Sequence, residues 1–139
     1  MTSATVSIEA CRAEIAAQIQ AYRDLVGAAS KASGMSLTRI EAALAAFEPA
    51  FFNNLLVALD ARFGGRPHAP GPMSEVRLLA ASLMHGGGLL RADPAIPYDA
   101  DGSVLRLEAG ERIALNGDDF DALCAAFLAA LDTAAGDAA

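Results

Sequence analysis

The sequence of 139 residues is 54% hydrophobic and 19% charged, which excludes an intrinsically disordered chain, because disorder needs low hydrophobicity and high net charge. Its 10 basic and 17 acidic residues give a formal net charge of -7. The chain therefore lacks the excess of basic residues that is typical of proteins that bind nucleic acid or an anionic membrane. The length is typical of one domain. We therefore expect a single folded domain that binds neither nucleic acid nor membrane.

Three features favour a cytoplasmic protein. Residues 1–7 contain neither a basic nor an apolar segment and do not resemble a secretion signal. The longest apolar run, residues 122–131, is too short to cross a bilayer. Cys11 and Cys124 lie far apart in the sequence without the spacing of a redox motif, so we expect two buried free thiols.

An amphipathic helix is predicted at the start of the chain. Ser7 is a suitable N-cap residue for it, and Gly34 is a suitable end. Apolar residues recur between these points at spacings of three or four positions, which places them on one helix face. They are Ile8, Cys11, Ile15, Ile19, Tyr22 and Val26.

A second helix is expected to begin at Thr38, because the Thr38 hydroxyl and the Glu41 carboxylate fit a capping box. Pro49 has no amide proton, and its ring clashes with the carbonyl group of Ala45 in an uninterrupted helix. We therefore predict that this helix kinks or restarts at Pro49, with a third helical segment over residues 49–63.

Glycine and proline residues predict a loop over residues 64–72, before a helix over residues 73–85. Residues 104–107 and 112–115 each favour a strand, and the glycine-containing connection between them predicts a β-hairpin.

The last helix is expected to begin after Asn116 as its N-cap, with Leu115 packed on Phe120 across the first turn. An apolar face then continues along this helix. Its members are Phe120, Leu123, Phe127 and Leu131.

These elements predict a mainly α (α+β) fold in one domain over residues 1–139, with about five helical segments and one short β-hairpin before the C-terminal helix. Residues 1–34 hold the N-terminal amphipathic helix. Residues 36–131 form the helical core, with the hairpin over residues 104–115, and residues 132–139 form a frayed tail.

Polar residues in an otherwise apolar helix are the main candidates for a functional site. Asn53 and Asp60 lie on one face of the predicted segment over residues 49–63, and a buried carboxylate is costly unless it has a partner. One hypothesis is a small polar pocket in which Asp60 is an acid, a base or a ligand. The other is a structural pair between Asp60 and an arginine of another helix, which we favour because structural ion pairs are commoner. Arg62 and Arg77 are the candidate arginines for Asp60 or Glu75.

No catalytic, metal or cofactor site is predicted. The sequence contains neither a GxSxG motif nor a phosphate-binding loop, and Cys124 lies on or beside an apolar helix face where an unreactive thiol is expected. His68 and His85 lack the spacing of zinc ligands.

An ordered run of motifs over residues 54–131 resembles a family of small uncharacterised bacterial proteins. The matching motifs include Asn54-Leu55, Leu59-Asp60, Glu75-Val76-Arg77, Gly88-Leu89, Tyr98, Asp119-Phe120 and Ala126-Phe127, together with residues 103–107 and 110–115. The resemblance implies a discrete bacterial cytosolic protein and supplies no activity. The candidate binding residues are then Asn54, Asp60, Arg62, Glu75 and Arg77.

Two classes of function follow from these observations. We favour a non-catalytic interaction or assembly module that acts as a homo-oligomer, because the catalytic spacings are missing and the helices carry surplus apolar surface. The alternative is a small enzyme or ligand-binding protein with a polar cleft around Asp60, Arg62, Glu75 and Arg77.

A homodimer that associates through helices is the expected assembly, and a different protein partner also fits an apolar surface. The first predicted helix carries the apolar face that suggests it, through Ile8, Ile15, Ile19 and Val26. The alternative is that this face packs on the second and last helices of the same chain.

Overall fold

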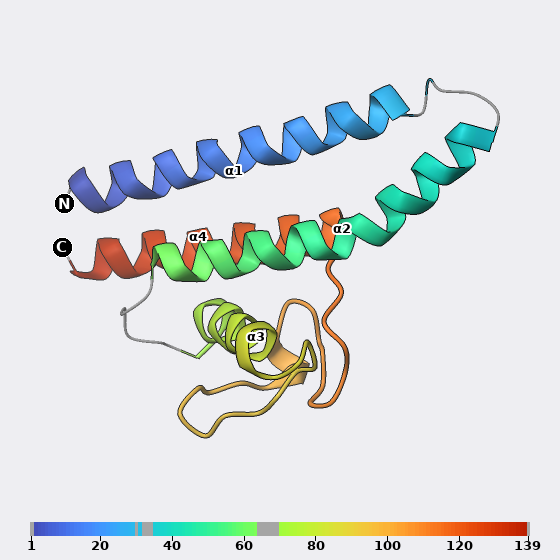
Figure 1. Cartoon of the computed structure of the whole chain (residues 1–139). Coiled ribbons are helices and arrows are strands. Elements are labelled where there is room, and N and C mark those ends of the chain that lie inside the picture. The colour runs from blue at the N-terminus through green and yellow to red at the C-terminus, as the bar shows by residue number, and fades with distance from the viewer. Residues whose placement is uncertain (1, 30, 32–34, 64–69, 139) are drawn as a thin grey trace.

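The computed structural model describes residues 2–29, 31, 35–63 and 70–138. Within them the elements are α1 (Thr2–Ala29), α2 (Met35–Arg62), α3 (Pro72–His85), a short 3-10 helix η1 (Ala100–Gly102) and α4 (Gly117–Ala138). Figure 1 shows α1, α2 and α4 as an elongated group in which α2 and α4 run opposite to α1, with α3 and the connection from residue 86 to residue 116 beneath it. The mainly α prediction is therefore confirmed.

The apolar face predicted for the last helix forms the centre of the core. Phe120, Leu123, Phe127 and Leu131 are all buried on α4, against buried side chains of the other helices. Each large apolar side chain removed from water contributes about 1.5–3 kcal/mol. The spacing of three and four residues thus indicates correctly which side of α4 faces inward.

The N-cap of α4 is also as predicted. The amide of Asp119 donates to Asn116 Oδ1 at 2.7 Å, and the amide of Asn116 donates back to Asp119 Oδ2 at 3.3 Å. Leu115 and Phe120 are both buried beside this cap. The reciprocal bonds fix the residue at which α4 begins.

The apolar face of the first helix is internal over most of its length. Ile8, Cys11, Ile15 and Ile19 are buried within the chain's own core, where α1 contacts α2 and α4. This packing is the alternative that the sequence left open. Only the far end of the predicted face, at Val26, is exposed.

The prediction of five helical segments is wrong, because α2 continues through Pro49. Figure 1 shows that α2 bends instead of breaking, as a proline within a helix is expected to cause. Ala45 is exposed, so water can hydrogen-bond to the carbonyl group that Pro49 leaves without an amide partner. Thr38 lies within the helix and not at its start, because α2 begins at Met35.

The predicted β-hairpin over residues 104–115 is also wrong, and no regular strand forms in the described part of the chain. Residues 110–113 pair with residues 88–90, which follow α3. The amide of Ile113 donates to the Gly88 carbonyl at 2.8 Å, and the amide of Leu90 donates to the Glu111 carbonyl at 2.8 Å. The chain can turn back after α3 because Gly87 and Gly88 adopt φ values of 71° and 82°, which favour glycine.

Two further predictions concern the ends of elements. The predicted loop over residues 64–72 is described only from Pro70, so its residues 64–69, His68 among them, lie outside the described residues. His85 is exposed in the last turn of α3. The backbone of α4 remains helical from residue 132 to Ala138, where the sequence analysis expected a frayed tail.

The end of the α1–α2 hairpin extends beyond α4 in Figure 1. We call the described residues 22–29, 31 and 35–48 the arm. Most of the exposed large apolar side chains in the described residues lie on it, namely Leu25, Val26, Ile40 and Phe47, whereas Met84 and Val104 are exposed elsewhere. By length and composition, the stretch Thr38–Arg62 could cross a membrane, although the core helix of a soluble protein passes the same test. The second half of α2 packs in the core of this chain through Phe52, Leu56 and Leu59.

Asn53 anchors the connection that precedes α4. Its Nδ2 donates to the Ile113 carbonyl at 3.0 Å, and its Oδ1 accepts from the Leu115 amide at 3.2 Å. Asn53→Ala leaves both backbone groups without this partner, so we expect a loss of about 1–3 kcal/mol in the free energy of unfolding. Asn54→Ala is the matched control, because Asn54 is exposed, and it should change stability by less than about 0.5 kcal/mol. Urea unfolding of both variants measures the difference.

The two cysteines are free and buried, as the sequence predicted. Burial raises the pKa of the Cys124 thiol from 9.0 to about 11, and the neighbouring Cys11 adds to this shift. The folded protein therefore holds this proton to a higher pH than the unfolded chain does. Its contribution to stability is complete below pH 9 and is lost as the pH rises to about 11.

We expect the wild-type protein to lose about 2–3 kcal/mol more stability than Cys124→Ala when the pH rises from 9 to 11, because only the wild type has this thiol to ionise. Urea unfolding at several pH values measures both slopes. Equal slopes would show that the Cys124 thiol is not shielded from water.

Candidate functional site

Asp60 forms an ion pair with Arg77, and the pair joins α2 to α3. The Asp60 carboxylate is 13% exposed, and its Oδ2 lies 2.8 Å from Nη1 of Arg77. This is the pairing with an arginine of another helix that the sequence favoured for Asp60. The charge of each residue is therefore balanced by the other at a partly buried position.

The other predicted site residues do not join this pair. Arg62 forms an ion pair with Glu14 of α1, and both side chains are exposed. This contact lowers the pKa of Glu14, since the carboxylate accepts a hydrogen bond from the Arg62 guanidinium. Asn54 is exposed on α2. Asp60 and Arg77 therefore contact each other, whereas Arg62 and Glu75 have other partners.

Glu75 is the most deeply buried charged residue in the described part of the chain, with 1% of its surface exposed. It lies in the first turn of α3, where the helix dipole favours a negative charge. The backbone amides of Val104 and Leu105 donate to its Oε1 at 2.8 Å and its Oε2 at 3.0 Å. Glu75 is thus satisfied by backbone donors and not by an arginine.

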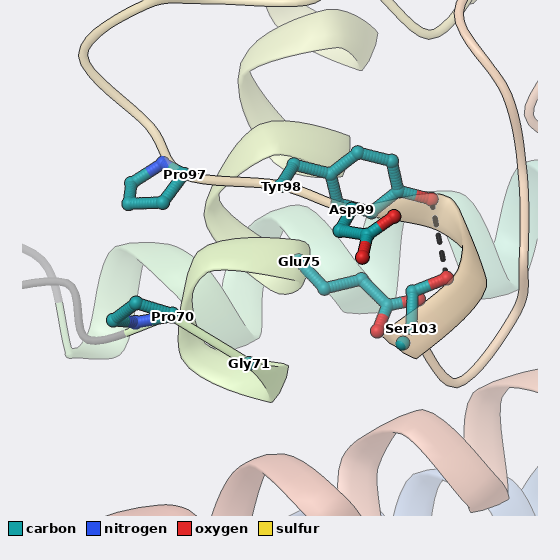
Figure 2. A pocket seen from close by; sticks show the side chains of 8 residues that line it. Pro70, Gly71, Glu75, Pro97, Tyr98, Asp99 and Ser103 are labelled. Carbon is teal, nitrogen blue, oxygen red and sulfur yellow. Dashed lines mark hydrogen bonds between the residues drawn. The ribbon is translucent and has the colours of Figure 1, made fainter.

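A cleft of about 520 Å³ opens beside Glu75, between the start of α3 and the turn around η1 (Figure 2). Most of the residues that line this cleft do not belong to the site predicted from the sequence. The lining residues are Pro70, Gly71, Glu75, Pro97, Tyr98, Asp99, Gly102 and Ser103. This cleft is the candidate functional site, since it contains a carboxylate, a phenol and a hydroxyl group.

The polar groups around the cleft bind one another and the backbone. The Tyr98 hydroxyl donates its single proton either to Ser103 Oγ, at 3.3 Å as Figure 2 shows, or to the Leu107 carbonyl. Ser103 Oγ donates to the Ala100 carbonyl at 2.8 Å and accepts from the Arg106 amide at 2.8 Å. These bonds hold the turn in a fixed shape.

The chemistry available at the cleft is limited by these bonds. Burial raises the pKa of the Tyr98 phenol, and the negative charges of Glu75, Glu111 and Asp99 add to this effect. The phenol therefore stays protonated at neutral pH and does not act as a base. Both oxygens of Glu75 are already hydrogen-bonded, so the cleft presents Asp99 as its exposed carboxylate. In the described residues, no group of three or more His, Cys, Asp or Glu side chains could hold a metal ion.

Sequence reasoning missed Tyr98, Asp99 and Ser103 as neighbours of Glu75 because they lie in an irregular turn. The only signal was indirect. Tyr98 and Ser103 belong to the motifs that resemble the bacterial family, but no periodicity connects them with α3.

Comparison of this chain with protein-family models, with curated proteins and with solved structures finds no match. The function must therefore be argued from the residues of this chain alone.

Glu75→Gln tests whether the buried carboxylate has a structural role. The amide nitrogen of glutamine cannot accept from a backbone amide, so one of the two bonds is lost and two donors face each other. We expect a loss of about 1–3 kcal/mol in the free energy of unfolding. Asp99→Asn is the matched control, because it keeps the Oδ1 that accepts from the Asp101 amide, and it should change stability little. If both variants are as stable as the wild type, Glu75 does not anchor the turn.

Proposed function

We propose that this protein is a non-catalytic interaction module that acts as a homo-oligomer in the cytoplasm. The observation that carries this proposal is the arm, on which Leu25 is 54% exposed and Phe47 is 47% exposed. Exposed apolar residues that cluster on one part of a surface commonly mark an interface with another protein.

The polar residues support the same proposal. Asp60 is paired with Arg77, and Glu75 with two backbone amides, so these residues have structural partners. The alternative proposal, an enzyme or ligand-binding protein, needs Asp60, Arg62, Glu75 and Arg77 in one cleft. It has less support, because only Asp60 and Arg77 pair with each other, whereas Arg62 pairs with Glu14 and Glu75 accepts from backbone amides.

We expect the purified full chain to have twice its monomer mass of 14.2 kDa at micromolar concentrations, because two copies can cover each other's apolar surface. Light scattering in moderate salt measures the mass. Moderate salt screens exposed charges and leaves an apolar interface intact. Native mass spectrometry of the protein from its host would also detect a retained ligand. A mass of 14.2 kDa at these concentrations would contradict the proposed homo-oligomer.

A further inference from the structure

We infer that the arm, residues 22–29, 31 and 35–48, is the surface through which two copies of this chain associate, as an antiparallel pair of two-helix arms related by a two-fold axis. This inference rests on the proposed function, because it names the surface and the partner of the same homo-oligomer. The partner is a second copy of this chain.

The arm is packed at its root and uncovered beyond it. Tyr22 contacts Phe51 and Phe52 at the root, with ring centroids 5.0 Å and 5.6 Å apart. Farther out, α4 no longer covers the two helices, as Figure 1 shows. Val26 on α1 and Ile40 on α2 are both exposed in this part of the arm. A second two-helix arm packed on this one would complete a four-helix bundle, the usual way for such helices to bury apolar faces.

A cleft at the root of the arm can receive an apolar side chain from the second copy. Its volume is about 460 Å³, and Tyr22, Val26 and Phe52 supply its apolar wall. The arm that carries the protruding side chains supplies Tyr22, Val26 and Glu48 to this cleft. A two-fold interface needs such self-complementarity, because each copy presents the same surface to the other.

The charge distribution favours a second copy as the partner. The arm carries three basic and three acidic residues, namely Arg23, Lys31, Arg39, Asp24, Glu41 and Glu48. The other residues of the chain are 7 basic and 14 acidic, so they carry the whole net charge of -7. Two copies therefore repel each other least where their arms meet, since like charge across an interface is unfavourable.

The order of charges along the arm favours an antiparallel pair. Lys31, Arg39 and Glu41 lie towards its tip and give it a net charge of +1, whereas Glu48 and Asp118 of α4 lie at the cleft at its root. The basic Arg23 at the root is paired with Asp121 at 3.2 Å, so the root remains acidic. An antiparallel pair brings the basic tip of each arm towards the acidic root of the other. A parallel pair would place like charges together.

A membrane is the competing occupant, because the arm includes the first part of the stretch Thr38–Arg62. The net charge of -7 opposes an anionic bilayer. The arm also carries charges of both signs among its apolar residues, which suits a protein interface better than a hydrocarbon core.

The first experiment compares single substitutions that place a charge at exposed apolar positions. Leu25→Glu and Phe47→Glu alter the arm, and Met84→Glu is the matched control on α3, where the side chain is 61% exposed. Circular dichroism verifies that each variant keeps its helices. Analytical ultracentrifugation should show dimer dissociation constants at least about tenfold weaker for the two arm variants, because each would bury an unpaired charge, and no change for Met84→Glu.

The second experiment tests the antiparallel arrangement with Arg39→Glu and Glu48→Arg. Each variant alone should dimerise about tenfold more weakly than the wild type, because two tip-to-root attractions become repulsions. An equimolar mixture of the two should dimerise as the wild type does, because opposite charges then meet at both ends of the pair. The two substituted side chains face each other at one end, and the native Arg39 and Glu48 face each other at the other end. A mixture that dimerises no better than the single variants would overturn the antiparallel pair.

The outcomes separate this inference from the proposed function. A wild-type monomer contradicts the homo-oligomer and the arm interface together. If the wild type is a dimer that Met84→Glu dissociates but the arm variants do not, this result contradicts the arm interface alone. Flotation with vesicles of phosphatidylcholine and phosphatidylglycerol should leave the protein in solution. If the wild type binds these vesicles and Phe47→Glu abolishes the binding, the arm is a membrane-binding surface and the inference is overturned.

Discussion

The buried carboxylate of Glu75 holds the long irregular connection between α3 and α4 against the helices. That connection contains no regular strand, so side chains must satisfy backbone groups that a β-ladder would otherwise pair. Glu75 accepts from the amides of Val104 and Leu105, and Asn53 binds the segment just before α4 from the other side. Asn53 thus holds the segment that leads into α4, and the cap between Asn116 and Asp119 fixes the residue at which α4 begins.

The position of that starting point determines which surface is left for interaction. The root cleft includes Gly117 together with Tyr22 and Glu48, so the first residues of α4 are level with the root of the arm. Beyond them the apolar face of α1 loses its cover, and its side chains change from buried at Ile19 to exposed at Val26. The turn that Glu75 organises is thus linked to the uncovered arm through the start of α4, although the two are far apart in sequence.

Local signals in the sequence predicted part of this structure. The cap at Asn116 and the apolar face of α4 depend on residues within a few positions of one another, and the pair of Asp60 with an arginine follows from the cost of an unpaired carboxylate. The pairing of residues 110–113 with residues 88–90, in place of a hairpin, depends on two distant segments that meet only in the fold. The partners of Glu75 are backbone amides, which every residue except proline possesses, so no sequence pattern could identify them.

Pro49 connects the bend of α2 with the free arm. A proline in a helix interior costs about 3 kcal/mol relative to alanine, and α2 nevertheless continues through it. The bend separates the half of α2 that packs in the core, around Phe52 and Leu56, from the half that belongs to the arm. Figure 1 shows the first half turning away from the line of α4. Phe47 lies just before Pro49, where its ring packs on Tyr22 and Phe51 but remains 47% exposed, so part of this aromatic surface stays open to a second copy.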